Sequence, residues 1–135
     1  QLRISHLYET EPHFDKPGST VASVPNYINA ALSGFTHLSP SQLLISIQNI
    51  ENVLGRTRSI PCAPRTLDID VLLYDDAIID TPELTVPHPR MHLRNFVLVP
   101  ACDIESDWIH PIFGKTLAQL LASCPDALAL KPYRR

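Results

Sequence analysis

The run LDIDVLLY at 67–74, in which apolar and acidic residues alternate, restricts the fold more than any other part of the chain. Such alternation indicates a strand, because successive side chains of a strand point to opposite faces. Leu67 and Ile69 then share one face, and Asp68 and Asp70 share the other with Cβ atoms ~6.5 to 7 Å apart. We therefore expect a strand over 67–74 with an apolar face and an acidic face.

A helix is predicted between Ser39 and Gly55. Ser39 can cap its start, Pro40 suits the first helical position, and Gln42 completes a capping box. Apolar residues then recur at helical spacing until Gly55, a residue type that commonly follows a helix. This segment is the clearest helix of the sequence.

The other segments complete a mixed α+β domain. Alternation predicts antiparallel strands over 2–10 and 27–35, and residues 77–79 suggest a short hairpin return after 67–74. The apolar segment 96–104 fits either a helix or a buried strand. The remaining expectations are long loops at 11–26 and 55–66, a helical turn within 84–94, and a short helix over 116–123. With 135 residues, we expect a single domain over 1–135.

Composition excludes several classes of protein. The net charge of −3 argues against a nucleic-acid partner bound through bulk charge. No apolar stretch approaches the about 18 residues that would span a bilayer, so no membrane partner is expected. Only four glycines occur, and none forms a phosphate-binding loop. Three sparse cysteines fit a reducing cytosol, and we expect a cytoplasmic protein.

The acidic pair Asp68 and Asp70 is the first candidate site. Two close carboxylates repel, and they relax by protonation, by pairing with arginine, or by sharing divalent cations. Arg56, Arg58 and Arg65 lie on the preceding loop, and sites that transfer phosphoryl groups combine such cations with metal-binding carboxylates. The ordinary alternatives stay open: a solvated strand face and a loop charged for solubility.

Two weaker candidates bear polar or aromatic groups. His88 is held between two prolines and, with Arg94, could bind a phosphate or a nucleobase edge. Tyr27 and Asn29 share a strand face, and with Phe96 they could hold a flat heterocycle between aromatic rings and an amide. A rigid turn and ordinary core packing are the alternatives.

A series of motifs resembles one family, the 6-hydroxymethyl-7,8-dihydropterin pyrophosphokinases of folate biosynthesis. The run P-R-T-L-D-I-D followed by V-P-H-P-R-M is the most specific part. The matching motifs are S-x-L-Y-E-T at 5–10, Y-I-N-A-A at 27–31, L-L-x-x-I-Q-x-I-E at 43–51, G-R-x-R at 55–58, P-R-T-L-D-I-D-V-L-L-Y at 64–74, L-T-V-P-H-P-R-M at 84–91 and R-x-F-V-L-x-P at 94–100.

The resemblance implies an activity and a fold. Members transfer pyrophosphate from ATP to the hydroxymethyl group of the reduced pterin and release AMP, with two Mg²⁺ ions between the ATP phosphates and two aspartates. The implied partners are therefore ATP and hydroxymethyl-dihydropterin, both small molecules. The implied fold is a ferredoxin-like antiparallel sheet with helices packed against it.

The resemblance also implies a role for each matching residue. The implied catalytic residues are Arg56, Arg65, Asp68 and Asp70, of which Asp68 and Asp70 hold the metal ions. The implied ATP pocket consists of Gln48, Glu51, Arg58, Arg65, Val71, Thr85, His88 and Arg94. The implied pterin pocket consists of Thr10, Tyr27, Asn29, Asp68 and Phe96.

Two departures from the family pattern matter. Family members begin with a strand, a G-S-N turn and a helix, ~35 to 45 residues that are missing before Gln1. The resemblance therefore implies a fragment, a part of a folate-pathway fusion, or an interior sheet edge that something else fills. Cys62 and Ala63 also replace the family's usual aromatic residue and glycine. An inactive nucleotide- or pterin-binding module and a metal-dependent hydrolase are the alternative functions.

Overall fold

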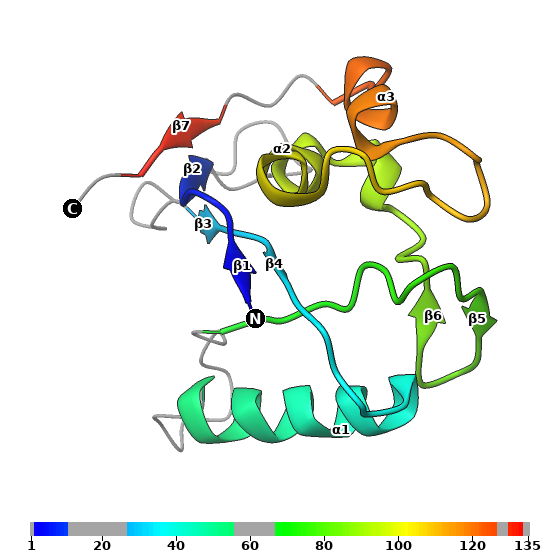
Figure 1. The fold of residues 1–135 in the computed structure, drawn as a ribbon. Coiled ribbons are helices and arrows are strands. Elements are labelled where there is room, and N and C mark those ends of the chain that lie inside the picture. Colours follow the sequence, from blue (N-terminus) through cyan, green and yellow to red (C-terminus); the bar gives the residue numbers. More distant parts are fainter. Residues whose placement is uncertain (1, 11–26, 56–66, 127–129, 134–135) are drawn as a thin grey trace, which may run out of the picture. The chain divides into compact units, whose positions relative to one another are not determined.

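The computed structural model describes residues 2–10, 27–55, 67–126 and 130–133 (Figure 1). They fall into two compact units. Unit 1 combines Gln1–Phe35 with Arg90–Arg135, and unit 2 is Thr36–Pro89. Each unit contains helices and antiparallel strand pairs, so the α+β class is confirmed. A single domain over 1–135 stays a prediction.

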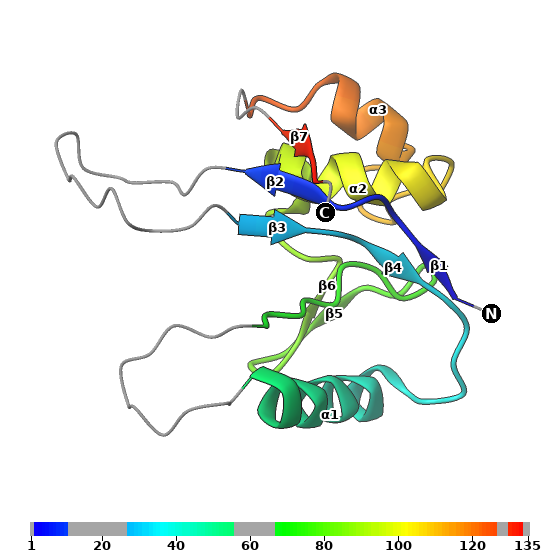
Figure 2. The same ribbon diagram turned by 90° about the vertical axis from the view of Figure 1, so that its left-hand side faces the viewer.

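The sheet of unit 1 has the order β3-β2-β7 (Figure 2). Its central strand β2 (Tyr8–Thr10) is antiparallel to both β3 (Tyr27–Asn29) and β7 (Lys131–Pro132). A separate antiparallel pair joins β1 (Arg3–Ile4) to β4 (Leu32–Ser33). The antiparallel pairing of the segments predicted over 2–10 and 27–35 is therefore confirmed, although each segment is divided into two short strands.

The division of these strands has a local cause at Ser5. Its backbone N–H donates to the Ala31 carbonyl at 2.9 Å, but its hydroxyl accepts the Ala31 N–H at 2.8 Å and donates to the His6 carbonyl at 2.7 Å. The side chain of a serine can compete for backbone groups in this way. Ser5 is buried, so between β1 and β2 these bonds replace the regular ladder with the segment that contains β3 and β4.

The helices of unit 1 form its core. The segment 96–104, left open by the sequence, is helical within α2 (Asn95–Glu105). A 3₁₀ turn at Met91–Leu93 precedes it, as expected within 84–94, and α3 (Leu117–Ala122) packs against α2. The buried apolar side chains of this core are Met91, Leu98, Ala101, Leu117 and Leu120.

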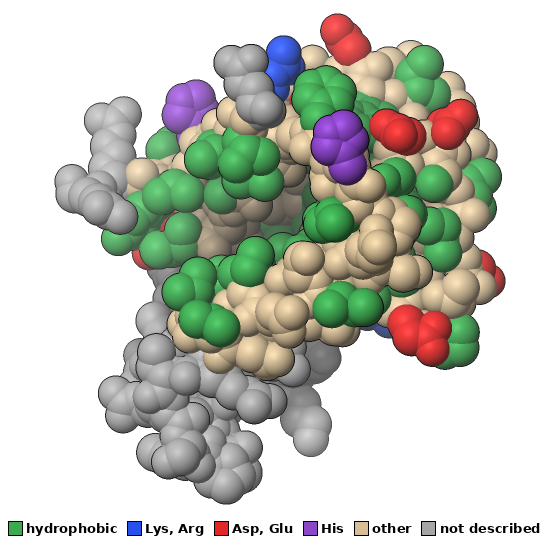
Figure 3. Space-filling model, turned by 60° about the horizontal axis from the view of Figure 1, so that its bottom comes forward, with side chains coloured by type: hydrophobic (Ala, Val, Ile, Leu, Met, Phe, Trp, Pro, Cys, Tyr) green, Lys and Arg blue, Asp and Glu red, His purple; other side chains and the backbone are tan. Residues whose placement is uncertain are grey.

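Unit 2 begins with the predicted helix. In α1 (Pro40–Ile50) the Ser39 hydroxyl accepts the Gln42 N–H at 3.2 Å, and the Gln42 side chain accepts the Ser39 N–H at 2.9 Å, which confirms the capping box. A π-helical turn at Glu51–Gly55 continues the helix to the predicted end. No residue of α1 is buried. Figure 3 shows hydrophobic side chains on the surface of the molecule. No helix of the described residues is long and apolar enough to cross a membrane.

The prediction of a strand over 67–74 is wrong, because these residues are not part of a ladder in the described structure. Their backbone groups have other partners: the Ile69 N–H donates to a Glu51 carboxylate oxygen at 2.7 Å, and the Leu72 carbonyl accepts the His88 N–H at 2.9 Å. Alternation of apolar and polar residues is a pattern of side-chain exposure, but a strand also needs a neighbouring strand with which to form hydrogen bonds.

The hairpin return has a different partner from the predicted one. A tight turn does follow Tyr74, whose carbonyl accepts the Ala77 N–H at 2.9 Å, and Asp75 adopts a φ of 49° there. The returning strand β5 (Ile79–Asp80) then pairs with β6 (Thr85–Val86), antiparallel, rather than with 67–74.

His110 is a buried histidine through which we expect acid to destabilise unit 1. It is 2% exposed, and its Nδ1 accepts the N–H groups of Ile112 at 3.2 Å and Phe113 at 3.3 Å, so the ring is neutral with its proton on Nε2. Burial lowers the pKa of His110, and nearby His92 lowers it further. Below pH about 6.5 the unfolded chain therefore binds a proton that the folded chain resists, and folding stability falls.

We accordingly expect the urea midpoint of unfolding to fall as the pH is lowered from 7 to 5, and to fall less in His110→Gln. Glutamine can still accept a backbone N–H but does not titrate. The exposed His37 provides the control, since His37→Gln should keep the acid loss of the wild type. An identical acid loss in His110→Gln and wild type would contradict the assignment.

Candidate functional site

The acidic segment 67–74 keeps the predicted alternation in exposure over its first half, residues 67–70, even without a ladder, whereas residues 71–74 are all partly buried. Asp68 and Asp70 are exposed. Leu67, which precedes them, and Ile69, which lies between them, are partly buried. Apolar contacts therefore hold the segment while both carboxylates remain open to solvent. Exposed carboxylate oxygens are the ligands that Mg²⁺ and other hard cations prefer.

Glu51 holds the acidic segment at the residue between its two aspartates. The Glu51 carboxylate accepts the N–H of Ile69 at 2.7 Å, and Ile69 is the residue between Asp68 and Asp70. A hydrogen bond from a backbone amide to an ionised carboxylate is roughly twice as strong as one between neutral groups. The π-helical turn that follows α1 thus holds the backbone from which the two aspartates project.

The donor set at this place suits a metal that also binds phosphate. The described residues contain no group of three or more His, Cys, Asp or Glu side chains placed to hold one ion. Asp68 and Asp70 would leave several coordination positions to other oxygens. Mg²⁺ is commonly bound in this way, through one or two carboxylates together with water and substrate phosphates.

The other predicted ATP residues of unit 2 lie on its helix, its strand β6 and the turn after it. Gln48 is exposed on α1, one turn before Glu51. Thr85 is exposed on β6, and the His88 backbone is bound to Leu72 of the acidic segment. Val71, partly buried, lies within that segment. Hydrogen bonds therefore connect Glu51 and His88 to the acidic segment, while Gln48 and Thr85 are placed by their own elements.

Three predicted pterin residues meet on neighbouring strands of unit 1. Thr10 on β2 and Tyr27 on β3 are paired in register. The Asn29 side-chain amide donates to the Thr10 hydroxyl at 3.3 Å. Thr10 is 3% exposed and Tyr27 is 57% exposed. The pair therefore combines a fixed polar group with a ring open to a ligand.

Phe96 and Arg94 form a second group in unit 1, at the start of α2. The Arg94 guanidinium carbon lies 5.7 Å from the centre of the Phe96 ring, a cation–π contact. Arg94, predicted for ATP, thus accompanies a residue predicted for the pterin. The predicted Arg56, Arg58 and Arg65, and with them Cys62 and Ala63, lie outside the described residues.

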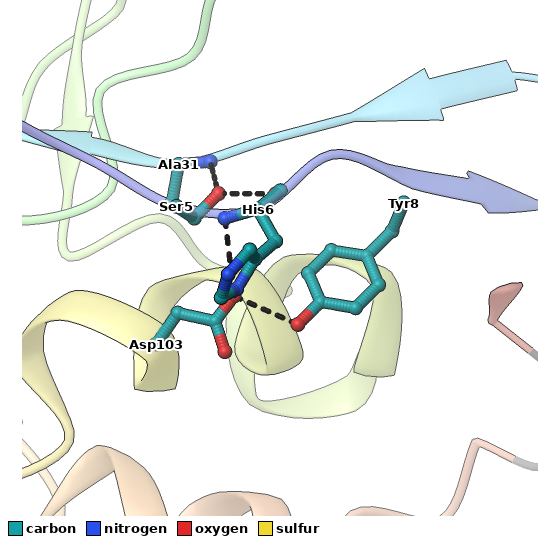
Figure 4. A network of polar contacts seen from close by, with 5 residues as sticks. All are labelled: Ser5, His6, Tyr8, Ala31 and Asp103. Carbon is teal, nitrogen blue, oxygen red and sulfur yellow. Dashed lines mark hydrogen bonds and ion pairs between the residues drawn. The ribbon is translucent and has the colours of Figure 1, made fainter. Parts of the chain in front are cut away.

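A polar cluster around Asp103 on α2 was missed by the sequence analysis (Figure 4). One Asp103 oxygen, Oδ2, accepts the His6 N–H at 3.2 Å and the Tyr8 hydroxyl at 2.7 Å, and lies 3.2 Å from His6 Nδ1. The hydrogen bond to Asp103, with burial and the Asp103 charge, raises the pKa of Tyr8 to about 12. The hydrogen bonds of this cluster join Asp103 to residues that lie 95 and 97 positions away in the sequence, so no local motif marks it.

Comparison with known proteins places the chain beside enzymes of pterin chemistry. The pattern of the family described as 7,8-dihydro-6-hydroxymethylpterin-pyrophosphokinase (HPPK) matches residues 1–106. A 2-amino-4-hydroxy-6-hydroxymethyldihydropteridine pyrophosphokinase of Synechocystis sp. is 44% identical over 108 residues, which cover 80% of this chain and 55% of that relative. The protein of the same name from Pseudomonas aeruginosa is 42% identical over 124 residues, covering 92% of this chain and 72% of the relative.

A longer relative is also similar. The folic acid synthesis protein fol1 of Pneumocystis carinii is 38% identical over 125 residues, which cover 93% of this chain but 16% of that protein. The chain therefore spans about half the length of the Synechocystis relative and a small part of the Pneumocystis one.

Proposed function

Because the chain belongs to the 7,8-dihydro-6-hydroxymethylpterin-pyrophosphokinase family, we propose that it transfers pyrophosphate from ATP to the hydroxymethyl group of 6-hydroxymethyl-7,8-dihydropterin. AMP and the pterin diphosphate are the products, and the reaction is a step of folate biosynthesis. The observation that carries the proposal is the place of Asp68 and Asp70. They lie within the matched residues, are exposed, and project from a backbone that Glu51 holds.

The reaction needs positioning and charge neutralisation more than a strong base. The pterin hydroxyl oxygen would attack the β-phosphorus of ATP and give up its proton to solvent. The bond from that phosphorus to the oxygen shared with the α-phosphate would break, so that AMP leaves with that oxygen. Two Mg²⁺ ions would neutralise the phosphate charge, held by Asp68 and Asp70. Arg56 and Arg65 would neutralise the charge on the transferred group, since guanidinium groups match phosphate oxygens in geometry.

The two substrates would use different sets of residues. Asn29 and Thr10 would read the donor and acceptor edge of the pterin, while the Tyr27 and Phe96 rings stack on its flat faces. Asp68 would lie close to the pterin as well as to the metal. The proposed ATP pocket consists of Gln48, Glu51, Arg58, Arg65, Val71, Thr85, His88 and Arg94.

Three wider statements belong to the same proposal. The fold would be the ferredoxin-like sheet with helices that the family resemblance implies. The enzyme would act in the cytoplasm on small-molecule partners. Its similarity to a small part of the Pneumocystis protein supports occurrence within larger folate-synthesis proteins.

The proposal is tested by AMP formation from ATP in purified protein. We expect AMP only when ATP, the reduced pterin and Mg²⁺ are all present, and we expect a chelator to stop turnover because the phosphate charge is then unscreened. Restoring Mg²⁺ should restore the rate. AMP or ADP formation without the pterin would support a hydrolase instead. Calorimetric binding of ATP and the pterin without AMP formation would support an inactive binding module.

A further inference from the structure

We propose that Asp103 is a positioning residue that sets the distance between the two halves of the pterin pocket. One half is Thr10 with Asn29 on β2 and β3, and the other is Phe96 on α2. The inference rests on the proposed function, since it concerns the same pterin. It assigns a role to a residue that no sequence motif marks.

The first step concerns strand β2. Tyr8 and Thr10 are two positions apart, so their side chains leave the strand on the same face, ~7 Å apart along it. Tyr8 is bound to Asp103 through its hydroxyl at 2.7 Å, and Thr10 is bound to Asn29 at 3.3 Å. A shift of Tyr8 along the strand therefore shifts Thr10, the hydrogen-bond partner of Asn29, by the same amount.

The second step concerns helix α2, which packs against both β2 and β3. Phe96 and Asp103 are seven positions apart, which puts them on one face of the helix, ~10 Å apart along its axis. Asp103 is bound to β2, so it fixes how far the helix can slide along the strand. The position of the Phe96 ring against Thr10 and Asn29 depends on that register.

The third step separates this contact from ordinary anchoring of the helix. Glu105, two positions further on, accepts the Ser33 hydroxyl at 2.7 Å, and the Arg3 guanidinium donates to the Ile104 carbonyl at 3.1 Å. These bonds hold β1 and β4, which carry no predicted pterin residue. Asp103 alone among these anchoring residues bonds to β2, through a side chain that is only 24% exposed.

The test is a pair of substrate titrations on five proteins: wild type, Asp103→Ala, Asp103→Asn, Tyr8→Phe and Glu105→Ala. Pterin is varied at saturating ATP, and ATP at saturating pterin. We expect Asp103→Ala to raise the KM for pterin about tenfold and Tyr8→Phe to raise it about threefold, the loss of one or two hydrogen bonds. The KM for ATP should change less than about twofold in both. Asp103→Asn keeps an oxygen for the Tyr8 hydroxyl and should recover part of the loss.

Glu105→Ala is the matched control, because it weakens the same helix without touching β2. It should lower the urea midpoint while both KM values stay as in the wild type. A merely structural role for Asp103 would give the same pattern, so an unchanged KM for pterin in Asp103→Ala would overturn the inference. An equal rise in both KM values would overturn it too.

Calorimetric titration with the pterin keeps the inference separate from the proposed activity. If the wild type binds the pterin without forming AMP, the proposed function fails, and the inference is judged by the affinity of Asp103→Ala alone. A pterin affinity about tenfold weaker supports the positioning role. An affinity equal to that of the wild type, or a wild type that does not bind the pterin, contradicts it.

Discussion

Replacing Asp70 with asparagine will remove pyrophosphate transfer and leave pterin binding unchanged. The substitution keeps the size of the side chain but removes a negative charge that the proposed Mg²⁺ ions require. The acidic segment has only Asp68 as a second exposed carboxylate before its turn, and the phosphate charge would then be poorly neutralised. We expect AMP formation to fall by a factor on the order of 10³ or more, measured at saturating ATP and pterin.

The control for this substitution is Asp76→Asn. Asp76 is an exposed aspartate on the turn after the acidic segment, and its substitution should leave turnover within about twofold of the wild type. Pterin affinity, measured by calorimetry, should be equal in all three proteins because Thr10, Asn29 and Phe96 belong to unit 1. Turnover by Asp70→Asn at the wild-type rate would refute the metal role.

Replacing Glu51 with alanine will lower turnover about 100-fold, while glutamine at this position will retain most of it. Alanine removes the acceptor of the Ile69 N–H, so the backbone between Asp68 and Asp70 loses its 2.7 Å hydrogen bond. A misplacement of about 1 Å can cost this much in a positioned reaction. The amide oxygen of glutamine can still accept the Ile69 N–H. The Mg²⁺ concentration that gives half the maximal rate should rise in the alanine variant and stay near the wild-type value in the glutamine variant.

The same pair of variants distinguishes two roles for Glu51. If its charge contacts ATP directly, glutamine and alanine will lose similar amounts of activity and the KM for ATP will rise in both. If its main role is to hold the acidic segment, only alanine will show the large loss. Asn49→Ala, on the exposed surface of the same helix, should behave as the wild type.

Local patterns predicted the local parts of this fold. The Ser39 capping box is formed by residues three positions apart, and both of its bonds are present. The short helix α3 has the same kind of start at Thr116, where the Gln119 side chain returns the bond. Such signals depend on neighbouring residues alone, so a single sequence contains them.

Features that depend on distant partners could not be predicted in this way. Alternation correctly described which side chains are exposed at 67–70, but not at 71–74, and nothing in the run shows whether another strand lies beside it. The bond from Ile69 to Glu51 joins residues 18 positions apart, and the bond from Tyr8 to Asp103 joins residues 95 positions apart. Length alone also left the helix over 96–104 undecided.

The family resemblance assigned roles to more residues of the candidate site than reasoning from charge and spacing did. Reasoning from charge and spacing singled out Asp68 and Asp70, but it gave no role to Gln48 or Glu51, whose polar side chains resemble many others on helix surfaces. The roles of all these residues stay predictions until substitution tests them.

The composition of β7 has a consequence for how the sheet of unit 1 behaves in concentrated solution. Within the part of the chain that the structure describes, this strand is an edge of the β3-β2-β7 sheet and consists of Lys131 and Pro132, both exposed. Proline has no N–H to offer a neighbouring chain, and a lysine would place its charge against any added strand. The β7 edge is therefore protected against aggregation, because another molecule cannot readily extend the sheet there.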